Sequence, residues 1–195
     1  NQIYALPLYV DTLALFYNKD ILNSAGISRP PQDWEEFNSD VETITRLSGS
    51  GQVVQSAAAI GTARNINRST DLLAALMIQT GVRMTNDDNT GASFAGRVNN
   101  TPVGETALKY YTDFANPSVR TYTWNDVQPY SVDAFTQGKT AMMFNYSHQA
   151  GVLKGQASRL NFGVASMPQV SSMDIKNYAN YWGVGVTANS KYPNE

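Results

Sequence analysis

One carboxylate interrupts the long apolar run near the start of the chain. Residues 3–17 are almost wholly apolar and alternate as an extended strand does, and Asp11 stands in the middle of them. Burying an unpaired carboxylate costs on the order of several kcal/mol, about the net stability of a small domain. Asp11 must therefore face a partner, a hinge or a ligand-filled cleft in the folded chain.

Composition favours a globular chain with a neutral partner. The 195 residues suit about one domain, and 42% of them are hydrophobic, enough for a packed core. Charged residues make up 15% of the chain, below the usual share of about 25%. The 14 basic and 16 acidic residues leave no basic footprint for nucleic acid or an anionic membrane. No apolar run is long enough for direct membrane insertion.

The absence of cysteine narrows the chemistry further. Thiol catalysis, disulfides and thiolate metal sites are excluded, and we expect no metal or cofactor. The chain begins inside a strand-like segment and stops where polar residues could start a helix. We interpret it as a piece of a longer protein.

Strand and helix patterns alternate along the chain, which predicts an α/β or mixed α+β fold in one lobe over residues 1–195. Helices are predicted from capping residues Asp33, Ser69, Thr101 and Ser131 and from the terminators Gly26 and Gly81. The predicted helices are 20–25, 33–47, 69–80, 101–114 and 131–137, and the predicted strands are 3–17, 56–60, 139–145, 161–167 and 178–187.

Several motif fragments match by letters but lack the context that their chemistry needs. Residues 138–140 lack the first glycine of a phosphate loop, and residues 183–188 lie in a strand pattern without the acidic residue of a dinucleotide site. Residues 86–91 lack the glutamate of a calcium loop, and a lone His148 cannot build an ordinary zinc site.

Catalytic pairs also lack support. Ser147 beside His148 does not establish a nucleophile and base, and Asp11 has no second carboxylate for glycoside hydrolysis. A hydrolase that takes its second carboxylate from another domain stays open as an alternative.

What remains is a set of aromatic and amide side chains. Pyranose rings stack an apolar face on an aromatic ring, and their hydroxyls pair with carboxylates and amides. As a set these residues suit a sugar, although each aromatic alone is more simply a core or rim residue. The set comprises Tyr9, Trp124, Tyr146, Tyr181, Trp182, Asn65, Asn67 and Asn145.

Five blocks of the chain resemble, in order, the extracellular solute-binding proteins of carbohydrate ABC transporters. They are residues 13–22, 31–37, 134–145, 162–168 and 182–191. The resemblance implies one lobe of a periplasmic-binding-protein-like type II clamshell, mainly the inserted carboxy-terminal lobe. Residues 1–14 and 181–195 would then be hinge-crossing segments toward the other lobe.

The resemblance also implies candidate contacts. Asp11 stands where relatives place an acidic residue that bonds sugar hydroxyls, and the loop 64–68 is where relatives often present a contact. His148 replaces the usual stacking tryptophan, so stacking could move to Tyr146 or to Trp182. The expected ligand-binding set is Tyr9, Asp11, Asn65, Asn67, Tyr146, His148 and Trp182.

The expected function is non-enzymatic binding of a sugar or oligosaccharide outside the cytoplasm, in the periplasm or lipid-anchored on the cell surface. The full-length protein would deliver the sugar to the membrane permease of an ABC importer. Two alternatives stay open: a carbohydrate-active enzyme fragment, and the same fold carrying another solute such as glycerol phosphate or a polyamine.

Overall fold

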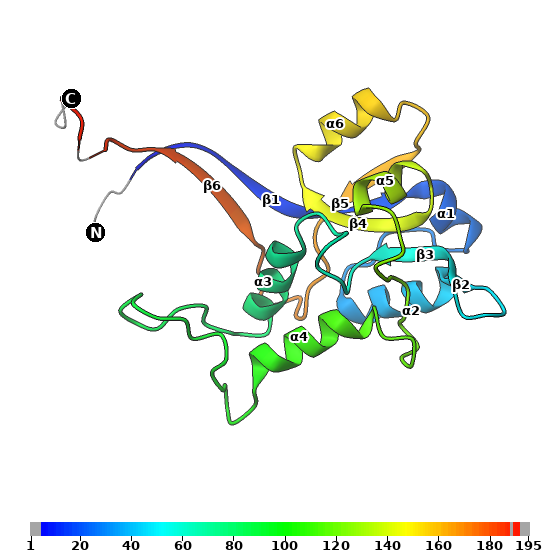
Figure 1. Cartoon of the computed structure of the whole chain (residues 1–195), viewed down its shortest axis with the longest axis horizontal. Coiled ribbons are helices and arrows are strands. Elements are labelled where there is room, and N and C mark those ends of the chain that lie inside the picture. The colour runs from blue at the N-terminus through cyan, green and yellow to red at the C-terminus, as the bar shows by residue number, and fades with distance from the viewer. Residues whose placement is uncertain (1–4, 188, 192–195) are drawn as a thin grey trace.

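A long central strand, β1, organises the mixed sheet of this α/β protein (Figure 1). The computed structural model describes residues 5–187 and 189–191. The strands are β1 (Leu6–Asn18), β2 (Arg46–Leu47), β3 (Val53–Ala59), β4 (Thr140–Tyr146), β5 (Phe162–Ala165) and β6 (Ala179–Val184). The helices are α1 (Lys19–Ser24), α2 (Trp34–Ile44), α3 (Ser69–Gln79), α4 (Val103–Asp113), α5 (Ser131–Thr136) and α6 (Gln149–Gln156).

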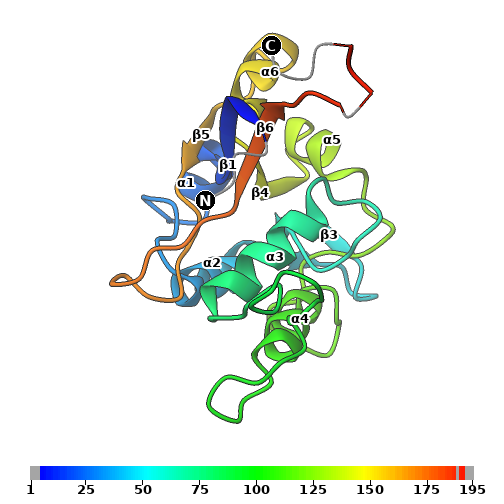
Figure 2. The ribbon, with the colours of Figure 1, turned by 90° about the vertical axis from the view of Figure 1, so that its left-hand side faces the viewer.

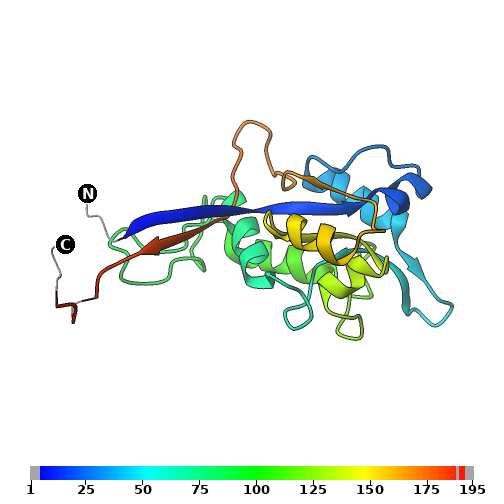
Figure 3. The ribbon, with the colours of Figure 1, turned by 90° about the horizontal axis from the view of Figure 1, so that it is seen from above.

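The two halves of β1 have different surroundings. The inner half pairs antiparallel with β4 from Leu13 to Tyr17 and with β5 from Leu15 to Asn18. The outer half, residues 6–12, pairs antiparallel with β6. Seen from above, β1 runs without interruption from this two-stranded ribbon into the body (Figure 3). The sheet order is β2-β3-β4-β1-β5, with β3 and β4 parallel.

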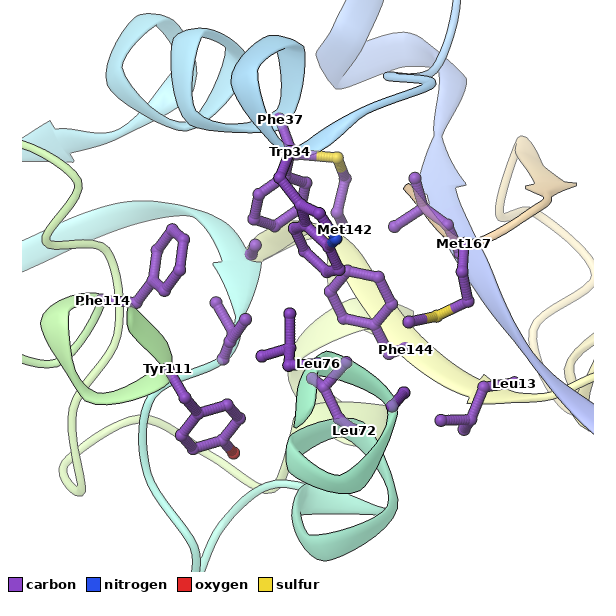
Figure 4. Close-up of a cluster of buried hydrophobic side chains, with 14 of the residues drawn as sticks. Leu13, Trp34, Phe37, Leu72, Leu76, Tyr111, Phe114, Met142, Phe144 and Met167 are labelled. Carbon is purple, nitrogen blue, oxygen red and sulfur yellow. The ribbon is translucent and has the colours of Figure 1, made fainter. Parts of the chain in front are cut away.

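Apolar side chains on both faces of the inner sheet build two cores. Leu13 and Leu15 belong to the larger core, whereas Ala14 and Phe16 belong to the smaller one, so β1 alternates between them. Figure 4 shows the larger core, where side chains from α2, α3 and α4 meet those of β4. Phe37, fully buried, lies 5.6 Å from Phe114 and 5.6 Å from Phe144 between ring centroids.

The two-stranded ribbon of β1 and β6 projects from this body (Figures 1 and 3). It leaves large apolar side chains in solvent. These exposed side chains are Leu6, Leu8, Tyr9, Val10, Tyr181, Trp182 and Val184. A two-stranded ribbon has little intrinsic stability in water, and exposed apolar patches of this kind mark contact surfaces.

Most predicted elements are confirmed, with shifted ends. The helix predicted to reach Leu47 ends at Ile44, because the chain turns into β2 there. Sequence patterns missed two elements, β2 and α6. The α/β class is confirmed.

Three of the four predicted caps are wrong, and one is only half right. Arg68, Pro102 and Tyr130 precede α3, α4 and α5, and none of them makes a side-chain cap bond. Asp33 does cap α2 by accepting from the amide of Glu36, but the Glu36 carboxylate accepts from the amide of Gln32 and from Arg29 instead of from the amide of Asp33. The reciprocal half of the capping box is therefore shifted by one residue.

Candidate functional site

Asp11 lies where β1 leaves the body, and it is 8% exposed. Its Oδ1 accepts from the amides of Thr12 at 2.7 Å and Ser147 at 3.0 Å, and from the Ser147 hydroxyl. Its Oδ2 accepts from the His148 amide at 3.2 Å and lies 2.6 Å from His148 Nδ1. A carboxylate offers about four acceptor positions. Hydrogen-bond donors of this chain therefore already occupy the acceptor positions of Asp11.

These bonds explain why a carboxylate occurs in the apolar run. Ser147 and His148 immediately precede α6, and free amides at a helix start need acceptors. Asp11 supplies the acceptor from a strand distant in sequence. Burial opposes its ionisation, but the hydrogen bonds from Ser147, His148 and Thr12 outweigh burial and hold the pKa of Asp11 well below its usual range.

The His148 ring is anchored on one edge and open on the other. Its side chain is 56% exposed, while Asp11 holds Nδ1. Its ring also stacks on Tyr146, with centroids 6.2 Å apart and planes 24° from parallel. The imidazole therefore has a fixed orientation at the surface, where the ribbon meets the body.

The buried Tyr146 ring supports the His148 ring from the side of the body. It is 2% exposed, and its hydroxyl donates to Asp71 of α3 at 2.9 Å. Burial and the neighbouring Asp71 carboxylate raise the pKa of this phenol. The guanidinium of Arg68 lies over the same ring, 4.9 Å from its centroid. Figures 1 and 2 show α6 and α3 on opposite sides of the ribbon's root, and this cluster connects them.

An aromatic pair continues the site along the ribbon. Tyr9 and Trp182 are cross-strand partners whose centroids lie 6.0 Å apart, with planes 15° from parallel. They are 55% and 52% exposed. Tyr9 and Asp11 are two positions apart on β1, so they share a face, about 7 Å apart along the strand. The aromatic pair and His148 thus border one surface.

The two predicted amide contacts, Asn65 and Asn67, lie in the loop before α3 and make hydrogen bonds with other parts of the body. Asn65 is 9% exposed; its Oδ1 accepts from Trp124 and Thr62, and its Nδ2 donates to the carbonyls of Asn125 and Gln128. It therefore ties the loop before α3 to the residues after Trp124. Asn67 is half-buried, and its amide donates to the Ser131 hydroxyl.

The remaining members of the sugar-suited set divide between core and surface. Trp124 is fully buried, and Asn145 is buried with its Nδ2 unpartnered in the described residues. Tyr181 is 77% exposed on the opposite face of the ribbon, because it pairs with Val10. None of these three side chains borders the surface between Trp182 and His148.

Sequence reasoning missed the partners of Asp11. Ser147 and His148 follow β4 and come to β1 only through the β1–β4 register, in which Leu13 opposes Tyr146. Asn180, opposite Asp11 on β6, was also missed. The signal for these pairings is the strand register, which single-sequence patterns do not supply.

Other features of the described residues do not add to this site. A groove of about 830 Å³ opens between Pro31 and Ile175, and no predicted site residue lines it. Residues 5–187 and 189–191 contain no cluster of three metal-ligating side chains. Across these ranges, no helix has both the length and the apolarity to span a bilayer.

Comparison with known proteins gives one consistent picture. Residues 1–195 match the family described as bacterial extracellular solute-binding protein. Proteins of Brucella abortus and Brucella suis, named only as binding proteins, are 29% identical over 172 residues, which is 86% of this chain and 38% of theirs.

Solved structures agree in fold. A solute-binding protein of an ABC transporter from Thermotoga lettingae, bound to α-D-tagatose, has a TM-score of 0.69 at 23% identity over 92% of this chain and 44% of its own. An ABC substrate-binding protein of Listeria monocytogenes in complex with cycloalternan has a TM-score of 0.72 at 17% identity, over 97% and 45%. The chain spans less than half the length of these relatives.

Proposed function

Because the chain belongs to the family of bacterial extracellular solute-binding proteins, we propose that it forms the sugar-binding lobe of such a protein. Family membership places the protein outside the cytoplasm, in the periplasm or at the cell surface. The whole protein would deliver a sugar or oligosaccharide to the membrane permease of an ABC importer. The observation that carries this proposal is the half-exposed Tyr9–Trp182 pair beside the anchored His148.

The chemistry of this surface fits a pyranose. Two nearly parallel rings at 6.0 Å offer an apolar platform for the face of a sugar. Beside it, the imidazole edge of His148 offers a polar contact for a hydroxyl. Asp11 and Tyr146 contribute by holding His148. Asn67 directly precedes Arg68, whose guanidinium lies over the Tyr146 ring.

Solved relatives bind small polyhydroxylated solutes. Similar structures hold mannobiose, and D-mannitol in a protein of Agrobacterium vitis. These ligands belong to those proteins, and for the present chain they define a first panel of test compounds.

The ribbon supports a two-lobed arrangement. We propose that residues 1–14 and 181–195 cross toward a second lobe, which would cover exposed apolar side chains of β1 and β6 other than the Tyr9–Trp182 pair. Residues 1–4, 188 and 192–195 of these segments lie outside the described residues. The solute would then bridge the lobes and stabilise a closed state.

We further propose that this lobe binds without catalysis. Glycoside hydrolysis needs one carboxyl with a raised pKa facing a second, ionised one. In the site Asp11 is held ionised, and Asp71 accepts from Tyr146. Burial and the nearby Glu36 raise the pKa of Asp40 to about 6, but Asp40 lies on α2 and takes no part in this cluster.

One observation favours a second cargo. Arg68 stacks on Tyr146 and makes no ion pair among the described residues, so its charge is available beside the site. A phosphorylated solute such as glycerol phosphate would use this charge.

A thermal-shift screen of the full-length protein separates these readings. We expect neutral sugars to raise its melting temperature, and Arg68→Gln to leave that rise unchanged. Stabilisation by glycerol phosphate that Arg68→Gln removes would instead establish the anionic cargo. Release of product from a panel of nitrophenyl glycosides would contradict non-catalytic binding.

A further inference from the structure

The Asp11 carboxylate is the first candidate for a polar contact with a solute, but donors of the chain already occupy it. Asp11 accepts from Thr12, Ser147 and His148, and it is 8% exposed. A solute hydroxyl could bond Asp11 only by displacing a donor of the chain. Leaving a buried donor without its acceptor is unfavourable, because the donor loses its partner without regaining water. The outward-facing group must therefore be another.

His148 is that group. Its Nδ1 lies 2.6 Å from Asp11 Oδ2, and its side chain is 56% exposed. An ionised carboxylate only accepts hydrogen bonds, so Nδ1 must carry the proton. In the neutral ring Nε2 then has a free lone pair. Nε2 makes no hydrogen bond within the described residues, and the side chain that carries it is more than half exposed.

We propose that His148 Nε2 is the hydroxyl acceptor of the site and that Asp11 is a positioning residue that fixes the Nδ1–H tautomer. This inference deepens the proposed sugar binding and rests on it for the identity of the solute. Two further contacts fix the ring: Tyr146 stacks on it, and the His148 amide also donates to Asp11. The acceptor therefore has a defined direction before solute arrives, which lowers the entropic cost of binding.

The charged and titratable groups around the ring are few. Asp11 faces it from β1, and the Tyr146 hydroxyl and Arg68 lie across the tyrosine ring. Asp71 is engaged by that hydroxyl. In the Nδ1–H tautomer, Nε2 can accept a hydrogen bond but cannot donate one.

The tautomer can be measured directly, because His148 is the one histidine in the sequence. In ¹⁵N-labelled chain at about pH 8.5, where imidazoles are neutral, we expect long-range ¹H–¹⁵N spectra to show a protonated Nδ1 and a bare Nε2. Ser147→Ala, which removes one donor to Asp11 and leaves the carboxylate in place, should keep this pattern. A predominant Nε2–H tautomer in the unmodified chain would overturn the inference without any ligand.

Binding tests the second half of the inference in the full-length protein. The probes are α-D-tagatose, mannobiose and D-mannitol, each titrated calorimetrically. An asparagine at 148 can keep the bond to Asp11 but lacks the outward nitrogen, whereas the histidine has both. We expect His148→Asn to weaken the affinity for any sugar that binds by about tenfold or more. The melting temperature of the variant should stay within a few degrees of that of the unmodified protein.

The outcomes separate the two proposals. Unchanged affinity of a binding sugar in His148→Asn would overturn the acceptor role of Nε2 and leave sugar binding standing. A failure of all three sugars to bind would count against the proposed function, and the tautomer measurement would still decide the role of Asp11.

Discussion

At the scale of the residue, Asp11 is explained by its donors. Its carboxylate satisfies the amides of Ser147 and His148 at the start of α6, a role that charged oxygens fill well near helix N-termini. Sequence reasoning identified Asp11 as a group that needs a partner, and the partner proved to be a turn about 136 positions away. The hydrogen bonds thus account for a charge in an otherwise apolar strand.

We expect Asp11→Asn to destabilise the chain by about 1–3 kcal/mol at neutral pH, since one acceptor becomes a donor facing amide hydrogens. The matched control is Asp88→Asn, at an exposed position without hydrogen bonds or ion pairs in the described residues. Chemical denaturation of both variants measures the difference in free energy of unfolding.

The pH dependence of this difference has a definite sign. The pKa of Asp11 is lowered on folding, so its stabilisation is complete above the unfolded value of about 3.9 and is lost as the pH falls toward the lower folded value. The gap between the unmodified chain and Asp11→Asn should therefore narrow as the pH falls below about 4. A gap that widens as the pH falls below that value would contradict the assignment.

At the scale of the element, one buried amide side chain bonds the chain between β5 and β6 to α3. Gln79 of α3 accepts from the Trp34 indole at 2.7 Å and donates to the carbonyls of Pro168 at 3.0 Å and Lys176 at 3.1 Å. These bonds place the segment that leads into β6. The position of the ribbon's second strand therefore depends on α3.

We expect Gln79→Met, of similar volume, to cost about 1–3 kcal/mol because three buried polar groups lose a partner. Amide hydrogen exchange should accelerate in residues 168–178 and remain slow in β4. Gln137→Met, at an exposed position after α5, should change neither. Uniform acceleration across the sheet would show that Gln79 stabilises the whole body instead of this segment.

Elements with strong local signals could be predicted, and those stabilised at a distance could not. β1 followed from its alternation and α2 from the Asp33 cap and its apolar spacing. Helix α6 was missed because it buries only Leu153, and its first amides bond to Asp11 on β1. For the site, Tyr9 and Trp182 could be named from residue type and His148 from the family resemblance, whereas their arrangement required the strand register.

At the scale of the whole molecule, we propose that half of the site lies in a second lobe, and the projecting ribbon supports this proposal. The chain spans 38% of the length of its Brucella relatives, and the apolar ribbon is exposed on both faces. We expect the isolated chain to bind sugars much more weakly than the full-length protein, since closure and the opposite wall are missing. Isothermal titration giving micromolar or tighter affinity for the isolated chain would contradict this.

The central claim is that a sugar stacks on the Tyr9–Trp182 face of the ribbon. The two other tryptophans, Trp34 and Trp124, are buried at 7% and 0% exposure, so fluorescence quenching of this chain by acrylamide reports mainly on Trp182. Tyr181 is next to Trp182 but lies on the opposite face, which makes it the matched control.

The most direct measurement is calorimetric titration of the full-length protein, with mannobiose, α-D-tagatose and D-mannitol, in three forms: unmodified, Trp182→Ala and Tyr181→Ala. We predict saturable binding of at least one sugar, a loss of about tenfold or more in Trp182→Ala, about 1.4 kcal/mol, and little change in Tyr181→Ala. Tight sugar binding that Trp182→Ala leaves unchanged would contradict the account.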